Sequence, residues 1–144
     1  MPILAGGFHG LLDDHRTPRD EAVVETLVNA VREAEHALGG NTLYVAGVDL
    51  SHVGPRFGQP PLDDEAKGIP HRTDDQALAA AASGVADAWF AAIAAGADAT
   101  SICAFAPTYA MLRCAEPGAG RRLAYAESAE ADGSVVTVAA MVWP

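Results

Sequence analysis

Residues Thr42 to Gly58 read TLYVAGVDLSHVGPRFG, and this stretch decides the fold that we expect. Its first part, residues 42–48, is apolar and β-branched, a pattern that predicts a buried strand. The second part places Asp49, Ser51 and His52 within four positions, before glycine and proline break the backbone. Ligands of parallel α/β sheets bind beyond the carboxyl ends of the strands. The stretch therefore predicts a site for acid–base or metal chemistry at a strand end.

The same residues also have an ordinary structural interpretation. Asp49 and Ser51 could cap a turn, and His52 could be a hydrogen-bonded core histidine. A serine–histidine nucleophile pair is not expected, because neighbouring residues on a strand point to opposite faces. We favour a site, because three polar side chains of different chemistry follow one predicted strand.

The composition limits the class of protein. The chain has 144 residues, of which half are apolar and 19% are charged, as expected for a single globular domain over residues 1–144. A net charge of −10 argues against nucleic acid and anionic membrane surfaces as partners. The sequence has no run of about 18 apolar residues and no signal peptide, so we expect a cytoplasmic protein. Two cysteines are too few for a disulfide framework.

Helical and extended patterns alternate along the chain. The first part predicts a strand over residues 2–5 and a helix that is capped by Thr17 and continues to Leu38. Residues 55–70 have the prolines and acidic residues of a loop. An alanine-rich helix should start at Thr73 and be interrupted at residues 83–84, with a further helix over residues 85–93.

The last third completes an α/β pattern. It predicts a strand over residues 100–104 and a helix from Pro107 to Leu112. Two strands should follow, over residues 123–126 and 135–142, joined by a turn at Asp132 and Gly133. We therefore expect a mixed sheet that ends in an antiparallel strand pair.

The stretch from Thr42 to Gly58 also resembles a known family. Val-Asp-Leu-Ser-His followed by Gly-Pro-Arg-Phe-Gly, residues 48–58, resembles the Asp-x-x-His-x-x-x-Arg-Phe signature of the Memo family. The opening Pro-Ile-Leu-x-Gly strand, the Ile-Cys-Ala step at residues 102–104 and the last strand fall in the family's order. Memo proteins resemble class III extradiol dioxygenases, which are non-haem iron enzymes. The resemblance implies their three-layer α/β/α fold.

The resemblance covers the C-terminal half of that family only. Its N-terminal half carries two metal-binding histidines in His-Ala-Gly-like and Gly-x-x-His-like motifs, and neither motif occurs here. His9, His15 and His36 lie in different contexts and do not replace them. The chain could be a natural split subunit, a shortened gene product or an expressed fragment.

The resemblance assigns roles to a few residues. It places His52 where the dioxygenases have the histidine that acts as general base or orients oxygen and substrate. Asp49 lies three residues before His52 and could orient its ring or hydrogen-bond the loop. Cys103 falls where the dioxygenases have a glutamate metal ligand and Memo proteins have a cysteine. Without the resemblance, Cys103 could equally be a small buried hydrophobic residue. Ala104 departs from the family's usual glycine.

Three further residues have roles that the sequence leaves open or makes structural. Arg56 could bind a carboxylate or phosphate of a substrate, or could form a salt bridge with Asp63 or Asp64. We expect Cys114 to be structural and His71 to be solvated.

These observations lead to one expected function and two alternatives. We expect a Memo-like domain that contributes half of a mononuclear metal or redox site for Fe(II) or copper, bound weakly or not at all by the isolated chain. A homodimer or a separate N-terminal-half chain would complete it. One alternative is a ring-cleavage dioxygenase subunit that acts on a small aromatic molecule with such a partner. The other is a non-catalytic module that binds a ligand or peptide.

Overall fold

The computed structural model describes residues 2–3, 5–63 and 65–144. Helices dominate this part of the chain, and the strands are confined to its middle and its C-terminal end. The α-helices are α1 (His9–Asp13), α2 (Ala22–Leu38), α3 (Ile69–Ala81), α4 (Ala86–Ala94) and α5 (Phe105–Ala115). The strands are β1 (His52–Val53), β2 (Arg121–Ala129) and β3 (Val135–Val142), and short 3-10 turns cover Pro18–Asp20, Pro55–Phe57 and Ala66–Gly68.

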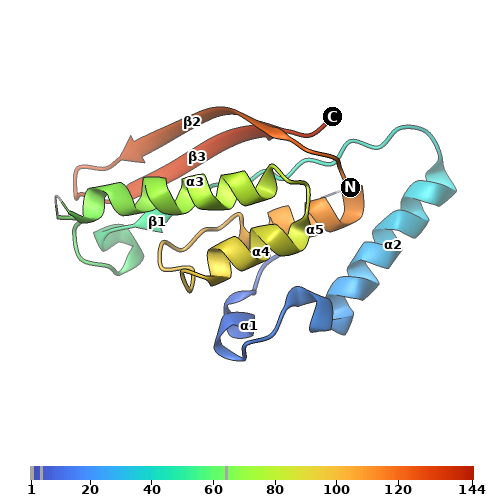
Figure 1. The fold of residues 1–144 in the computed structure, drawn as a ribbon, viewed down its shortest axis with the longest axis horizontal. Coiled ribbons are helices and arrows are strands. Elements are labelled where there is room, and N and C mark those ends of the chain that lie inside the picture. Colours follow the sequence, from blue (N-terminus) through green and yellow to red (C-terminus); the bar gives the residue numbers. More distant parts are fainter. Residues whose placement is uncertain (1, 4, 64) are drawn as a thin grey trace.

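The strands form an antiparallel sheet in the order β1-β3-β2 (Figure 1). β2 and β3 are the predicted C-terminal pair, and β3 has the predicted bounds. Gly133 adopts a φ of 83° in the connecting turn, where a residue with a side chain would be strained. β1 joins the other edge of β3 through His52 opposite Val136 and Val53 opposite Val135.

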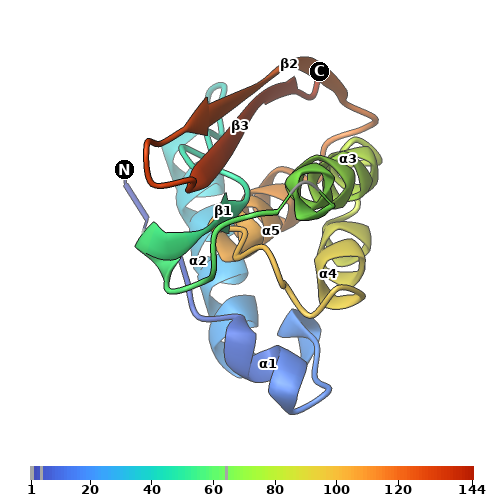
Figure 2. The same ribbon diagram turned by 90° about the vertical axis from the view of Figure 1, so that its left-hand side faces the viewer.

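Helices lie on the inner side of the β2–β3 hairpin. Figures 1 and 2 show α3, α4 and α5 below it, with α2 running across the far end of α5. The described strands pair only in antiparallel fashion, so the expected parallel strands of a mixed sheet are absent from this part of the chain. The three-layer arrangement stays a prediction.

An aromatic cluster fills the space between the helices. Phe8, Phe90, Phe105 and Tyr109 pack mostly edge to face, with ring centres 5.2–6.3 Å apart. Trp89 is fully buried beside them, and its indole N–H donates to the Phe105 carbonyl at 2.8 Å. These rings make the α4–α5 contact the centre of the apolar core.

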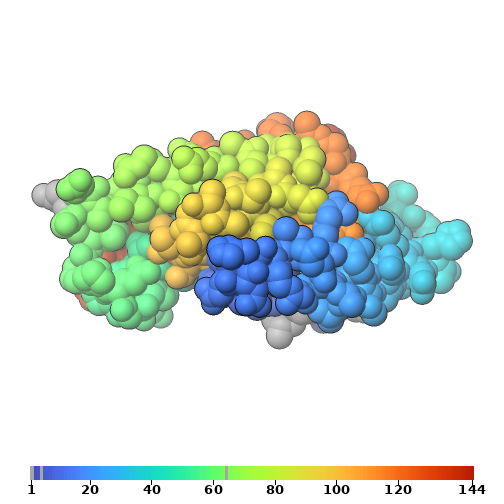
Figure 3. Space-filling model, turned by 60° about the horizontal axis from the view of Figure 1, so that its bottom comes forward, coloured from blue at the N-terminus to red at the C-terminus, as the bar shows by residue number. Residues whose placement is uncertain are grey.

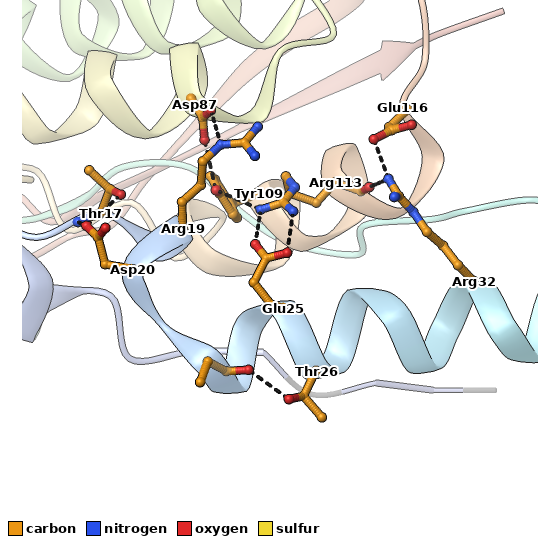
Figure 4. A network of polar contacts seen from close by, with 11 residues as sticks. Thr17, Arg19, Asp20, Glu25, Thr26, Arg32, Asp87, Tyr109, Arg113 and Glu116 are labelled. Carbon is orange, nitrogen blue, oxygen red and sulfur yellow. Dashed lines mark hydrogen bonds and ion pairs between the residues drawn. The ribbon is translucent and has the colours of Figure 1, made fainter.

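A polar network fastens α2 to this core. The Arg113 guanidinium on α5 contacts both carboxylate oxygens of Glu25 on α2, at 2.8 and 3.0 Å (Figure 4). It also donates to the Tyr109 hydroxyl at 3.3 Å, and that hydroxyl donates to Asp87 on α4 at 2.9 Å. In Figure 3, α1 and the first turns of α2 cover one side of α4.

Two predicted strands are wrong. Residues 42–48 run extended, with their side chains alternately more and less exposed, but form no strand, because no described segment lies at hydrogen-bonding distance on either side. Residues 100–104 form a loop, because Ala97, Asp98 and Ser101 have positive φ values that turn the backbone sharply. The strand predicted at residues 2–5 includes Leu4, which lies outside the described residues; residues 2, 3 and 5 form no strand.

The helix ends were predicted better than the helix starts. α2 ends at Leu38 beside Gly39, as predicted, and the break at residues 83–84 separates α3 from α4. Thr17 and Asp20 form the expected capping interaction, but it opens a 3-10 turn, and α2 begins at Ala22. α3 begins at Ile69 instead of Thr73, because Pro70 fits the first helical turn and extends the helix backwards. Within the described residues, no helix is long and apolar enough to cross a membrane.

Candidate functional site

The segment from Asp49 to Val53 is held on both sides. On one side, the Leu50 N–H donates to the Thr137 carbonyl of β3 at 2.8 Å. On the other side, the His52 N–H donates to the Thr100 carbonyl at 2.7 Å. This short segment therefore takes the place of a central strand, flanked by β3 and by the loop that leads to α5.

That loop brings Cys103 to the same place. The Cys103 N–H donates to the Leu50 carbonyl at 3.3 Å, and the Ala104 N–H donates to the Asp49 carbonyl at 3.0 Å. The loop can turn so closely because the Asp98 carboxylate caps it, accepting the Ile102 N–H at 2.7 Å. Backbone hydrogen bonds thus fix Cys103 beside Asp49 although the two are 54 positions apart.

Asp49, His52 and Cys103 form one cluster. Each offers a ligand atom, and these atoms all lie within 4.8 Å of one another. The imidazole Nε2 of His52 is 3.7 Å from a carboxylate oxygen of Asp49. Asp49 and Cys103 are exposed and His52 is mostly covered, so the cluster opens to solvent on one side.

The hydrogen bonds of His52 fix its tautomer. Its Nδ1 lies 2.9 Å from the Leu50 carbonyl, which can only accept, so Nδ1 carries the proton. The lone pair of Nε2 is then left for the cluster, where it can bind a metal or take a proton. The ring of Phe57 packs edge-on against the imidazole, with ring centres 5.0 Å apart, and limits its rotation.

The Cys103 sulfur exchanges two hydrogen bonds with the Asp49 backbone. It accepts from the Asp49 N–H and donates to the Asp49 carbonyl, both at 3.2 Å. Burial raises the pKa of the Cys103 thiol, and the Asp49 N–H opposes that rise. A metal ion at the cluster would replace the thiol proton, since the thiolate is the form that binds metals.

Arg56 makes its contacts at the β2–β3 turn. Its guanidinium lies 3.6 Å from Glu130, and its backbone N–H donates to the Ser134 hydroxyl at 2.9 Å. Of the two alternatives for Arg56, a salt bridge is therefore present, but its partner is Glu130 and not Asp63, because the hairpin turn folds back over the segment after β1. Asp64, the other predicted partner, lies outside the described residues.

Two other predicted residues lie away from the cluster. Cys114 is partly buried on α5, where burial raises the pKa of its thiol. His71 is exposed, as expected, and its Nε2 also pairs with Glu127 at 2.6 Å while its ring lies against Tyr125. The start of α3 at Ile69 explains these contacts, since it places His71 on a helix facing β2.

The sequence reading missed a buried polar network behind Ser51. It contains Asp74 on α3, Thr100, Tyr125 on β2 and Thr137 on β3. A signal for Asp74 was available in its spacing. Asp74 lies four and seven positions before Leu78 and Ala81, so it belongs to the apolar face of the helix. An aspartate on such a face is buried and needs hydrogen-bond donors.

The cluster has the donor set and the spacing of an incomplete metal site. Imidazole and thiolate ligands suit iron and copper, and a carboxylate can share the same ion. Ligand atoms around one ion lie about 3.5 Å apart when bond lengths are about 2.0–2.3 Å. The distance of 3.7 Å between the His52 Nε2 and the Asp49 carboxylate meets this requirement. All three ligand atoms lie within 4.8 Å of one another, so small side-chain movements would bring them to the distances needed around one ion.

Comparison with known proteins gives one family. A family model described as Memo-like protein matches residues 14–142. A MEMO1 family protein of Thermococcus onnurineus (strain NA1) is 37% identical over 57 residues, which are 40% of this chain. The matched stretch spans a fifth of the length of that relative. No solved structure gives a significant match.

Proposed function

The chain belongs to the Memo-like protein family, and on that premise we propose that it contributes half of a mononuclear non-haem metal site with redox chemistry. The observation that carries the proposal is the convergence of nitrogen, sulfur and oxygen donors within 4.8 Å. His52 and Cys103 are the proposed metal ligands, the Leu50 carbonyl orients the imidazole through Nδ1, and the Asp49 carboxylate, 3.7 Å from Nε2, lies close enough to support the same ion. The proton on Nδ1 supports this assignment, because it leaves Nε2 free for the metal.

The proposed metal is Fe(II) or copper, which accept an imidazole and a thiolate together. Either metal would supply a centre that changes its oxidation state beside a bound substrate. Two protein ligands are one short of the three that open catalytic sites usually keep. We therefore expect weak metal binding by this chain alone.

A partner chain would supply the missing ligands, either a second copy or the remaining part of the fold. Two observations support a partner. The matched relative is much longer than the matched stretch. Apolar grooves of about 530 and 590 Å³ also flank the extended residues 42–48, and a partner could fill them. Free thiols at Cys103 and Cys114 suit a reducing compartment, so we place the assembly in the cytoplasm.

The completed site could cleave aromatic rings. In that case His52 would act as base or ligand, and Phe57 would offer its ring beside the site. Arg56 would exchange its contact with Glu130 for an acidic group of a small aromatic substrate. A ligand-binding module is the second candidate. The groove of about 530 Å³ favours it, because Trp89, Met111 and Met141 contribute to its lining.

Metal titration of the purified chain tests the proposal. Co²⁺ serves as a probe, because a cobalt–thiolate bond absorbs in the near ultraviolet and reports the sulfur ligand directly. We expect a cobalt–thiolate band in the native chain and its loss in Cys103→Ala. His52→Ala should weaken Co²⁺ binding at least tenfold, as expected when a ligand or its support is removed.

The controls are Cys114→Ser and His71→Ala, which change the same residue types away from the cluster. Both should keep the band. A native chain that gives no cobalt–thiolate band, alone or with a candidate partner, would exclude the metal site. If such a chain still binds small molecules in the groove, the ligand-binding module would be the better description.

A further inference from the structure

A buried carboxylate lies directly behind the candidate site. Asp74, on the inner face of α3, has no exposed surface, and no cation contacts its carboxylate within the described residues. Burying an aspartate without a positive partner is costly unless hydrogen bonds compensate for the lost hydration. The hydrogen-bond donors around this carboxylate therefore show what stabilises its buried charge and which segments it connects.

Three hydroxyl groups donate to Asp74, each from a different segment. The Ser51 hydroxyl donates at 2.7 Å, the Thr137 hydroxyl of β3 at 2.5 Å and the Tyr125 hydroxyl of β2 at 2.7 Å. Asp74 thus ties α3, both strands of the hairpin and the site segment to one point.

Ser51 is the most constrained member of this group. Its N–H donates to the Thr137 hydroxyl at 2.9 Å, and its carbonyl accepts the Thr137 N–H at 3.0 Å. Its hydroxyl is also 2.8 Å from the Thr100 hydroxyl, and the Thr100 carbonyl accepts the His52 N–H. With both its backbone and its side chain held, Ser51 cannot rotate without moving its neighbours.

Those neighbours are the site residues. Ser51 precedes His52 and lies two positions after Asp49, and its side chain points inward, so the side chain of His52 points outward to the cluster. Thr100 begins the loop that carries Cys103. The hydrogen bonds to Asp74 therefore fix the direction of His52 and the position of the Cys103 loop relative to it.

We propose that Asp74 is a positioning residue for the metal cluster: by holding Ser51 and Thr137, it aims the His52 imidazole at Cys103. This role rests on the proposed metal site. A carboxylate suits the role because it only accepts hydrogen bonds and has room for several donors. An apolar side chain could pack α3 against the sheet as well, but would remove the acceptor that three hydroxyl groups share.

The test compares Asp74→Asn with three variants, all in a Cys114→Ser background. Asp74→Asn keeps the shape but puts an N–H₂ donor where a hydroxyl donates. Ser51→Ala removes the link between Asp74 and the site segment. Tyr125→Phe removes a hydroxyl that binds Asp74 but does not touch the site segment. Asp75→Asn is the neighbouring control, since Asp75 is exposed and pairs with Arg122.

Two readouts separate positioning from stability. The first is the affinity for Co²⁺, which should fall at least tenfold in Asp74→Asn and Ser51→Ala. It should change less than threefold in Tyr125→Phe and Asp75→Asn, although Tyr125→Phe lowers stability. The second readout needs no metal: ¹⁵N NMR of the His52 ring should show a proton fixed on Nδ1 in the native chain and a mixture of tautomers in Asp74→Asn.

Several results would overturn the role of Asp74. A folded Asp74→Asn that binds Co²⁺ within twofold of the native chain and keeps its His52 tautomer would do so. A loss of affinity in Tyr125→Phe as large as in Asp74→Asn would make the effect one of stability. If Asp74→Asn does not fold, Ser51→Ala decides. If the native chain binds no Co²⁺, the metal proposal fails by itself, and the His52 tautomer still decides whether Asp74 orients the ring.

Discussion

Gly54 and Gly58, just after β1, differ in the space available for a side chain. Gly54 has a φ of 105° and a ψ of −172°, a conformation that is essentially restricted to glycine. A Cβ atom there would lie 2.7 Å from the Ser134 Cα and 3.1 Å from the Gly133 carbonyl. Gly58 has a φ of 78°, and a Cβ atom there would meet nothing within 4 Å.

We expect Gly54→Ala to be much more destabilising than Gly58→Ala. The second substitution adds only backbone strain, about 1 kcal/mol, whereas the first adds a clash with backbone atoms, for a total of about 3 kcal/mol or more. Urea unfolding of both variants measures the difference. Equal losses would show that the β2–β3 turn moves away from Gly54 at little cost.

Asp98 gives a prediction about pH. Its carboxylate is buried under the loop that carries Cys103, and burial raises its pKa, against the opposing effects of the Ile102 N–H and of His9. A raised pKa means that the folded protein holds this proton more tightly than the unfolded chain. The contribution of Asp98 to stability is then greatest below its ordinary pKa of 3.8 and decreases as the pH rises through the folded value.

Asp98→Asn should remove this dependence and raise the free energy of unfolding at pH 7. The amide oxygen can still accept the Ile102 N–H, and no charge has to be buried. Urea unfolding between pH 4 and pH 7 checks this, with Asp13→Asn as a control at an exposed aspartate. A variant less stable than the native chain at pH 7 would contradict the sign.

At the scale of elements, Arg113 links α5 to α2. Arg113 is mostly buried on α5 and makes two contacts with Glu25, while its backbone carbonyl accepts a hydrogen bond from Arg32 farther along α2 (Figure 4). Arg113→Met keeps an unbranched apolar stem but loses the contacts with Glu25 and Tyr109. We expect amide hydrogens of α2 to exchange roughly tenfold faster in this variant, because the helix separates from α5 more often.

Arg122→Met is the matched control, since Arg122 pairs with Asp75 at the surface. It should leave exchange in α2 unchanged. Uniformly faster exchange over the whole chain in Arg113→Met would instead indicate a global loss of stability.

The same scale shows what the sequence could predict. The β3 strand and the end of α2 depend on local signals, namely a run of β-branched residues at 135–138 and a glycine after the helix, and both were predicted. The extended conformation of residues 42–48 was also foreseeable, but a strand exists only where a second segment pairs with it. No local signal shows whether that second segment is present.

The cluster of Asp49, His52 and Cys103 also depends on contacts between distant segments, which local sequence patterns do not show. The polar residues of Asp49 to His52 stand out in the sequence, and the family resemblance pointed to Cys103. The distance between them depends on backbone bonds between segments 54 positions apart, which no local pattern encodes. The burial of Asp74 could have been read from its spacing, but its partners could not be predicted, because they are single hydroxyl groups on three distant segments.

At the scale of the molecule, residues 42–48 are the most exposed apolar segment of the middle of the chain. Leu43 and Val45 are 86% and 77% exposed, on the side of the segment away from the core. Unpaired backbone and apolar side chains together invite pairing with another chain. We therefore expect association, with a second copy or with a partner chain.

The double variant Leu43→Lys with Val45→Lys tests this. It should cost less than about 1 kcal/mol of stability, because both side chains are exposed, and it should abolish association. Sedimentation velocity at micromolar concentration measures the second effect, for the chain alone and mixed with a candidate partner. A native chain that stays a compact monomer in both experiments would contradict the expectation.

The pairing of Ser51 with Thr137 also has a consequence for the order of folding. These residues are 86 positions apart, whereas the β2–β3 hairpin joins neighbouring segments. Closing a loop of that length costs about 4 kcal/mol of chain entropy from its length alone, so the hairpin should form early and the site late. Contacts that form after the transition state mainly control the rate of unfolding. A metal bound at the cluster should therefore prolong the lifetime of the native state and leave the folding rate almost unchanged.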